Sequence, residues 1–269
     1  MDRGKPPANR ALTAFAAGLF VIGVIAVAGL VWPVVSGSIP TPHGDRQIGE
    51  LDYDRTQLHA DVVNAGFHMG DAAYVRIFKR EHLLELWMQG AAGRFELFRS
   101  YPICKYSGGL GPKLAEGDRQ APEGFYRVAK AQLNPNSRHH LAFNIGFPNA
   151  LDQELGRTGS FLMVHGGCTS IGCYAMTDAQ IDEIYAVIEA ALDNGQREVD
   201  VSIFPFRMTE TALQATARNA WSPFWHNLKQ GFDLFEREGA PPKVAACEGS
   251  YVFGGDAVGP GCKPITGWV

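Results

Sequence analysis

The 269-residue chain lacks the sequence features of several protein classes. It has no run of basic residues, and its 24 lysines and arginines are outnumbered by 28 aspartates and glutamates, giving a formal net charge of −4. No internal repeat and no low-complexity tract are visible. These absences exclude a repeat protein and give no support for nucleic-acid binding, so we expect no nucleic-acid partner.

Charged side chains are also absent from residues 11–35. Residues 11–32 alone would form a helix of about 33 Å at 1.5 Å per residue, which is enough to cross a bilayer. The basic residues lie before this segment, so we expect residues 1–10 to stay in the cytoplasm. We predict a transmembrane signal anchor over 11–35, in the inner membrane, with the rest of the chain in the periplasm. Cleavage within residues 35–38 would instead release that part into the periplasm.

Beyond the apolar segment the chain reads as one domain. Residues 36–49 contain a stretch rich in proline and glycine, SGSIPTPHGD, which predicts a linker. No later break of this kind is long enough to divide the chain. We therefore place one domain at 50–240, followed by a glycine-rich tail at 241–269.

The domain combines strand and helix patterns. Residues 54–66 predict a short helix that ends at a glycine. A capping box at Thr177–Gln180 opens a longer helix that ends at Asn194-Gly195. Another helix is expected from Ser222, with Ser222 as its cap and an inner stripe of Phe224, Leu228, Phe232 and Phe235. Aromatic and branched residues predict strands at 74–78, 83–88, 95–103, 125–129, 141–145, 160–164 and 199–204. We expect an α+β fold, mostly antiparallel and β-rich with packed helices.

Cysteine is scarce and odd in number: Cys104, Cys168, Cys173, Cys247 and Cys262. In an oxidising compartment an odd count leaves at least one thiol unpaired within the chain. Cys247 and Cys262 flank the glycine-rich tail, which would hardly stay ordered alone. Their context suggests a disulfide that closes the tail, with a contribution of about 3 kcal/mol.

Two of the cysteines fall in the segment HGGCTSIGCYAMTD, residues 165–178. A zinc site would need a second close pair of ligands, and none lies nearby. A thioredoxin-like redox motif has two residues between its cysteines, whereas Cys168 and Cys173 have four. Both cysteines could simply be buried as apolar residues of the core. This alternative accounts for Cys168 reasonably well but for Cys173 poorly. A nucleophile remains to be considered.

Cys173 follows Ser-Ile-Gly and shortly precedes the capped helix. Backbone N–H groups in such a turn are free to point at one spot, where they would lower the thiol pKa and stabilise an oxyanion. Gly172 has no side chain to block a substrate backbone. His165, at the end of a predicted strand, is placed to return to the same point. A Cys–His pair with such a turn is the apparatus of acyl transfer through a thioester.

The segment VHGGCTSIGCYAMTD resembles the signature of the L,D-transpeptidase (YkuD-domain) family, and more narrowly its YafK-like branch. Three further blocks resemble the same branch in the same order, and the resemblance spans about residues 70–235. They are residues 101–126, 143–159 and 203–209. One departure is Ile171, which stands where most members of the wider family have a second histidine.

The resemblance implies an enzyme of peptidoglycan, the bacterial wall polymer, that needs neither cofactor nor metal. Cys173 would attack the L-centre carbonyl of diaminopimelate in a stem peptide and expel D-alanine, with His165 as general base and then acid. The backbone N–H groups of Gly172 and Cys173 would hold the oxyanion. By analogy, a backbone carbonyl near Gly166 or Gly167 would orient His165.

Other residues have weaker claims to the site. Arg157 and Arg207 could hold substrate carboxylates, although Arg207 could equally brace the fold. Ser170 could bind substrate or cap its turn. The long loop at 108–124, with Lys113 and Asp118, could form a lid or a wall of the site. A Cys104–Cys168 disulfide would leave Cys173 free.

Three functions remain open. The first is an L,D-transpeptidase, in which an amine of a second stem peptide accepts the acyl group. The second is a hydrolase or amidase that uses the same thioester and releases D-alanine, or a wall-attached protein, to water. The third is a catalytically silent wall-binding module, against which the set His165, Ser170 and Cys173 argues. The expected partners are peptidoglycan stem peptides, with or without an attached protein, and the inner membrane.

Overall fold

The computed structural model describes residues 54–254 and 259–268, which belong to one compact unit. The predicted transmembrane segment at 11–35 and the linker lie outside the described residues. Among the residues that are described, no helix has both the length and the apolar character needed to cross a membrane.

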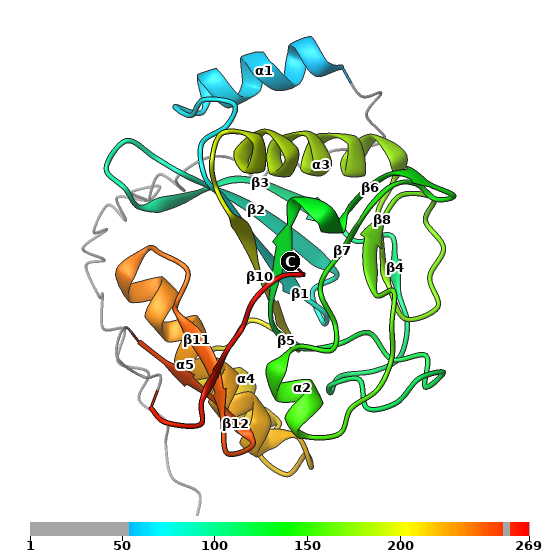
Figure 1. The fold of residues 1–269 in the computed structure, drawn as a ribbon, viewed down its shortest axis with the longest axis vertical. Coiled ribbons are helices and arrows are strands. Elements are labelled where there is room, and N and C mark those ends of the chain that lie inside the picture. Colours follow the sequence, from blue (N-terminus) through cyan, green and yellow to red (C-terminus); the bar gives the residue numbers. More distant parts are fainter. Residues whose placement is uncertain (1–53, 255–258, 269) are drawn as a thin grey trace, which may run out of the picture. The chain divides into compact units, whose positions relative to one another are not determined.

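Two five-stranded sheets form the framework (Figure 1). The first sheet has the order β3-β2-β1-β10-β5, in which β1 and β10 are parallel and the other neighbours antiparallel. Its strands are β1 (Ala73–Phe78), β2 (Leu83–Gln89), β3 (Phe95–Pro102), β5 (Gly124–Ala129) and β10 (Glu198–Phe204). All of β1 is buried, as expected for a central strand.

The second sheet carries the functional segment. Its order is β4-β9-β8-β7-β6, with β8 and β9 parallel and the other neighbours antiparallel. The strands are β4 (Lys105–Tyr106), β6 (Leu133–Ser137), β7 (His140–Asn144), β8 (Met163–His165) and β9 (Tyr174–Ala175). The mixed, mostly antiparallel α+β fold is therefore confirmed.

The tail holds more structure than its glycine content suggests. It forms a third sheet, β12-β11-β13, from β11 (Val244–Cys247), β12 (Ser250–Phe253) and β13 (Lys263–Pro264). The Cys247–Cys262 disulfide is present, with the two Cα atoms 4.5 Å apart. Tyr251 and Ile265 are buried in an aromatic-rich core cluster, so this segment is packed as part of the domain.

The helices largely follow the sequence patterns. They are α1 (Arg55–Asn64), α2 (Ala150–Glu154), α3 (Asp178–Asp193), α4 (Glu210–Ala215) and α5 (Ser222–Glu238), with a short 3₁₀ turn η1 (Lys130–Gln132). The capping box at Thr177 and Gln180 opens α3 as predicted, and Asn194 is its C-cap. Figure 1 shows α3 lying over the sheets, and α4 and α5 beside β11 and β12.

The start and inner stripe predicted for α5 are wrong in detail. Trp221 is the N-cap, so Ser222 is already helical. Trp225 is fully buried, while Phe224 and Phe232 are only partly buried. Leu228 and Phe235 of the predicted stripe are buried as expected. Trp225 joins them on the buried face and donates a hydrogen bond from Nε1 to the buried carboxylate of Glu123 at 2.8 Å.

The strand predicted at 160–164 is also shorter than expected. Only Met163 and Val164 of that range pair, and the strand continues to His165. Phe161 adopts a left-handed backbone with φ of 53°, which no residue within a strand can have. This bend places the Phe161 carbonyl beside the sulfur of Cys173.

Candidate active site

A cavity of about 580 Å³ opens on the second sheet. Cys173 and His165 both line it, together with residues of the β6–β7 turn and of the segment before β9. His165 pairs with Ala175 in the sheet, and Cys173 comes just before β9. Because β8 and β9 are neighbours, the sheet brings the two predicted catalytic side chains to one site.

Cys173 is the free cysteine of the described chain. The Cys104–Cys168 disulfide pairs the other two cysteines near the site, as the odd count suggested. The Cys173 sulfur accepts a hydrogen bond from the Met163 N–H at 3.4 Å. Its S–H donates to the Phe161 carbonyl at 3.6 Å. The thiol at rest is therefore held by backbone groups of the segment that leads into β8.

The expected lowering of the thiol pKa is not found. Burial raises the pKa of Cys173, and the Met163 N–H and the charge of Lys113 only partly oppose it. The turn before β9 does not surround the sulfur with enough donors to outweigh the loss of water. Cys173 at rest is a thiol, so to act as a nucleophile it would need a base to remove its proton.

His165 is oriented for that task. Its Nδ1 lies 2.6 Å from the carbonyl oxygen of Gly166, and the imidazole is 4% exposed. A carbonyl can only accept, so Nδ1 carries the hydrogen and Nε2 keeps a lone pair. Burial lowers the pKa of His165, and the neighbouring His139 adds to this lowering. The imidazole is thus neutral and offers a basic nitrogen.

His139 is a site residue that sequence reasoning missed. Its ring lies against that of His165, with the centroids 4.7 Å apart and the planes tilted by 34°. It also lines the cavity, and its carbonyl accepts a hydrogen bond from the Gly166 N–H at 3.1 Å. The sequence shows only a polar turn there. The pairing of β7 with β8 is what carries that turn to the site.

The turn before Cys173 differs from expectation in one respect. Gly172 has φ of 102°, a conformation that favours glycine. Its N–H, predicted to hold an oxyanion, donates instead to the hydroxyl of Ser107. Ser107 follows β4 and was not singled out in the sequence. In this structure an oxyanion would have to displace the Ser107 hydroxyl to reach the Gly172 N–H.

Ser170 closes the same turn. Its hydroxyl donates to the Cys173 carbonyl at 2.6 Å, so it caps the turn, and it also lines the cavity. Ile171 lies at the rim and is 80% exposed. The residue that replaces the second histidine of the wider family is thus in contact with solvent at the mouth of the site.

The two arginines proposed for substrate lie elsewhere. Arg157 is buried, with NH1 2.8 Å from the carboxylate of Asp152, and its guanidinium stacks over Phe224. Arg207 pairs with the buried carboxylate of Glu85 and stacks over Phe78. Neither lines the Cys173 cavity. Their contacts brace the fold, and the sequence could not reveal the buried carboxylates that engage them.

The long loop at 108–124 is anchored and is not a free lid, and none of its residues lines the Cys173 cavity. Lys79, fully buried, reaches it from the end of β1 and donates to the carbonyls of Gly111 and Ala121, each at 2.9 Å. The Lys79 ammonium also pairs with the buried carboxylate of Glu123 at 3.0 Å. Both ends of the loop are therefore attached to a single buried cation.

Lys113 and Asp118 stabilise the middle of the loop. Their side chains are 2.5 Å apart, and the Asp118 carboxylate also accepts backbone N–H groups of the loop. Partial burial opposes ionisation, but these hydrogen bonds lower the pKa of Asp118 to about 2. Asp118 is engaged within the loop, while the charge of Lys113 acts on Cys173.

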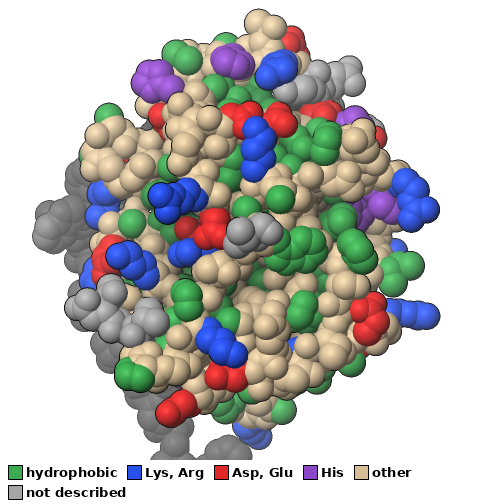
Figure 2. Space-filling model, viewed as in Figure 1, with side chains coloured by type: hydrophobic (Ala, Val, Ile, Leu, Met, Phe, Trp, Pro, Cys, Tyr) green, Lys and Arg blue, Asp and Glu red, His purple; other side chains and the backbone are tan. Residues whose placement is uncertain are grey.

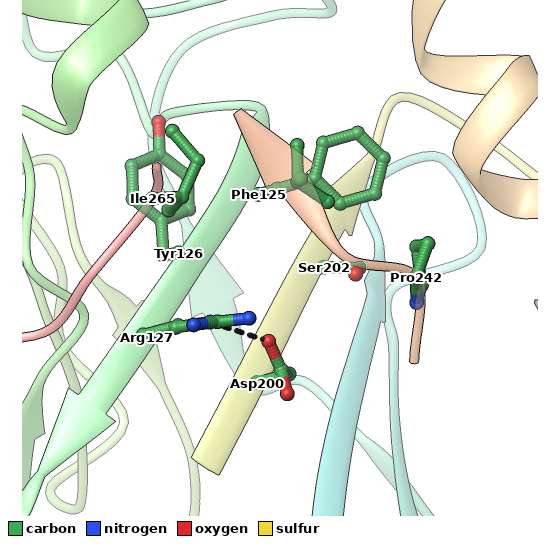
Figure 3. Close-up of a pocket in the computed structure, with 8 residues that line it drawn as sticks. Phe125, Tyr126, Arg127, Asp200, Ser202, Pro242 and Ile265 are labelled. Atoms are coloured by element: carbon green, nitrogen blue, oxygen red, sulfur yellow. Dashed lines mark hydrogen bonds and ion pairs between the residues drawn. The ribbon is translucent and has the colours of Figure 1, made fainter. Parts of the chain in front are cut away.

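Other hollows in the described chain fit the role less well. One lies where the first sheet meets the tail and contains the ion pair of Arg127 with Asp200 at 2.8 Å (Figure 3). Its volume of about 10 Å³ has room for about one water molecule. Figure 2 shows basic and acidic side chains interspersed on the face it views. Among the described residues, no three metal-ligating side chains gather to hold a metal ion.

Comparison with known proteins now identifies the chain. It is 50% identical over 184 residues to the Escherichia coli (strain K12) protein named "Putative L,D-transpeptidase YafK". The match covers 68% of this chain and 74% of that protein. The chain belongs to the L,D-transpeptidase family. Its YafK-like branch is the one that the sequence motifs indicated, and the O157:H7 strain's protein matches equally well.

The solved structures that resemble the chain are more distant. The cell shape determining protein Pgp2 from Campylobacter jejuni has 17% identity and a TM-score of 0.41, covering 72% of this chain and 82% of that one. L,D-transpeptidase 1 from Mycobacterium tuberculosis has 16% identity and a TM-score of 0.27, covering 51% and 64%. No family model matches the chain. At such low TM-scores these likenesses support no conclusion about the site or its chemistry.

Proposed function

We propose that this chain is a cysteine-dependent acyltransferase of the bacterial cell wall, an L,D-transpeptidase that works in the periplasm. The observation that supports it most is the site itself. A free thiol and a neutral, oriented imidazole line one open cavity, in a member of this family. Such a pair forms and resolves thioesters.

The proposed reaction starts from a protonated Cys173 thiol and a neutral His165 imidazole. The Cys173 sulfur attacks the L-centre carbonyl of diaminopimelate while the thiol proton passes to Nε2 of His165. The C–N bond to D-alanine then breaks, and His165 returns the proton to the leaving amine. A thioester remains on Cys173. An amine of a second stem peptide attacks the thioester and loses a proton to His165. The C–S bond breaks, and His165 returns that proton to the Cys173 sulfur.

One of the hydrogen-bond donors expected to hold the oxyanion is already occupied in the resting site. The Gly172 N–H is spent on the hydroxyl of Ser107. When the carbonyl oxygen of the substrate takes that N–H, the Ser107 hydroxyl is freed to donate to the same oxygen. Ser107 and Gly172 together would then stabilise the negative charge.

Hydrolysis is the second candidate. The rim residues Phe161 and Ile171 are 68% and 80% exposed, and this open rim would give water access to the thioester once D-alanine has left. The same thioester would then release a free stem, or a protein attached to diaminopimelate.

One experiment separates the candidates. The full chain is incubated with purified sacculi, and the muropeptides are identified by mass spectrometry. Dimers joined through two diaminopimelates indicate transfer, whereas freed stems or proteins indicate hydrolysis. Cys173→Ala should give neither, and Arg119→Gln, an exposed change in the loop, serves as the matched control. Unchanged products from Cys173→Ala would refute a cysteine mechanism.

A further inference from the structure

The cavity around Cys173 has cations and no anions in its lining. Lys105 and Arg138 are the cations, His139 and His165 also line it, and no aspartate or glutamate does. The chain as a whole is acidic, with 28 acidic residues against 24 basic ones. A cationic lining in an acidic protein favours an anionic ligand, because a cleft concentrates the field of the charges that line it.

The two strong cations of this lining have no acidic partner. Within the described residues, neither Lys105 nor Arg138 forms an ion pair, and both are exposed. Arg157 and Arg207 differ in this respect, because buried carboxylates engage both. Lys105 and Arg138 are therefore available to an incoming carboxylate without breaking a contact.

The sheet places these cations on opposite sides of the catalytic pair. Lys105 on β4 pairs with Ala175 on β9, and Ala175 pairs with His165 on β8. The three residues stand in one row, so Lys105 and His165 point to the same face, about 10 Å apart at 4.8 Å per strand. Arg138 lies in the β6–β7 turn, beyond the other side of His165.

We infer that Lys105 and Arg138 bind two carboxylates of the substrate, one on each side of the scissile bond. This inference rests on the proposed acyl-transfer function. In the stem peptide of that proposed function, the two groups are the carboxylate of the leaving D-amino acid and the carboxylate at the D-centre of diaminopimelate. Each cation determines specificity for one of these groups.

The test uses four synthetic tetrapeptides that differ only at these groups. Each carboxylate is either free or a primary amide, in all combinations. The full chain is compared with Lys105→Met, Arg138→Met and the control Lys243→Met, an exposed lysine outside the cavity. The measurement is kcat/KM for release of the terminal amino acid or its amide.

The parent should prefer the doubly acidic peptide, by about 10-fold at each carboxylate, as for a charge-assisted hydrogen bond. Each variant should lose about 10-fold on that peptide and lose the discrimination at one carboxylate only, a different one for each. Lys243→Met should keep the parent ratios. If both variants also keep them, the assignment is wrong.

A binding measurement separates this assignment from the proposed reaction. Affinities of the four peptides for Cys173→Ala are measured by calorimetry, with and without Lys105→Met or Arg138→Met. Loss of the acid-over-amide preference in the variants supports the assignment even if the parent forms no acyl-enzyme by intact mass. An acyl-enzyme that forms without any such preference supports the reaction and overturns the assignment.

Discussion

The Cys173 thiol donates to the carbonyl of Phe161, and the imidazole of His165 donates to the carbonyl of Gly166. At rest, the sulfur and the imidazole therefore have backbone partners. Burial raises the pKa of the thiol and lowers the pKa of the imidazole. Both shifts favour the neutral pair over an ion pair, so proton transfer belongs to the attack itself.

We expect this neutral pair to show in the pH dependence. His165 is a base when unprotonated, and its lowered pKa keeps it so to below about pH 6.5. Free thiolate appears only above pH 9.0, the ordinary value for a thiol, because burial raises the Cys173 pKa. Alkylation of the resting enzyme by iodoacetamide should therefore rise steeply only above that pH, while kcat/KM is already high at pH 7. An alkylation rate at pH 6 as high as the rate at alkaline pH would contradict this prediction, because it would indicate a thiolate already formed at rest.

At the scale of elements, the turn after β8 is clamped between its neighbours. The Gly166 N–H donates to the carbonyl of His139, and the Gly167 N–H donates to the Asp178 carboxylate at the start of α3. A Cβ on Gly166 would lie 2.6 Å from that carboxylate and 3.0 Å from the His139 carbonyl. The helix start and the β6–β7 turn thus fix the carbonyl that orients His165.

Gly166→Ala should therefore reduce catalysis more than it reduces stability. We expect a loss of about 1–3 kcal/mol in the free energy of unfolding from the forced shift. The fall in kcat should exceed 10-fold, because the His165 imidazole loses its orientation. Urea unfolding and steady-state kinetics measure the two effects. Gly109→Ala is the control, since a Cβ there meets nothing within 4 Å. Equal kcat values for both variants would contradict the clamp.

The buried pair of Lys79 and Glu123 anchors the loop at 108–124. Either single change, Lys79→Met or Glu123→Gln, should cost about 3–5 kcal/mol, because it leaves the partner charge buried and alone. The double variant should cost less than the sum of the two. Denaturant unfolding of the full chain gives all three values, and Lys130→Ala at an exposed pair should leave the midpoint unchanged. Strict additivity would show that the two charges are not coupled.

At the scale of the whole molecule, sequence and structure agree where local chemistry decides. The Thr177 capping box and the strands of the first sheet are of this kind. Disagreement arises where a residue's partner is distant in the chain. Buried carboxylates from elsewhere in the chain engage Arg157 and Arg207. The hydroxyl that accepts from the Gly172 N–H and the ring beside His165 also come from other segments. No local pattern encodes such contacts.

The Cys104–Cys168 disulfide joins the residue before β4 to the turn after β8, and these two cysteines are 64 residues apart in the chain. Loop-closure entropy for that separation predicts a stabilisation of about 4 kcal/mol. Cys104→Ser/Cys168→Ser should therefore unfold at markedly lower urea concentration. Activity should fall as well, because Lys105 and residues 169–171 line the cavity beside this bridge. Unchanged stability and activity after both substitutions would show that the bridge supports neither.

If the chain works in the periplasm, as we propose, the same bridge ties completion of the site to the redox state of the surroundings. A copy retained where glutathione keeps thiols reduced would carry three free thiols around its groove, and the two sides of that groove would be untethered. Oxidation forms the Cys104–Cys168 disulfide and leaves Cys173 as the free thiol of the groove. Competence to act on the wall would then be acquired only after translocation, on the side of the membrane where the wall is found.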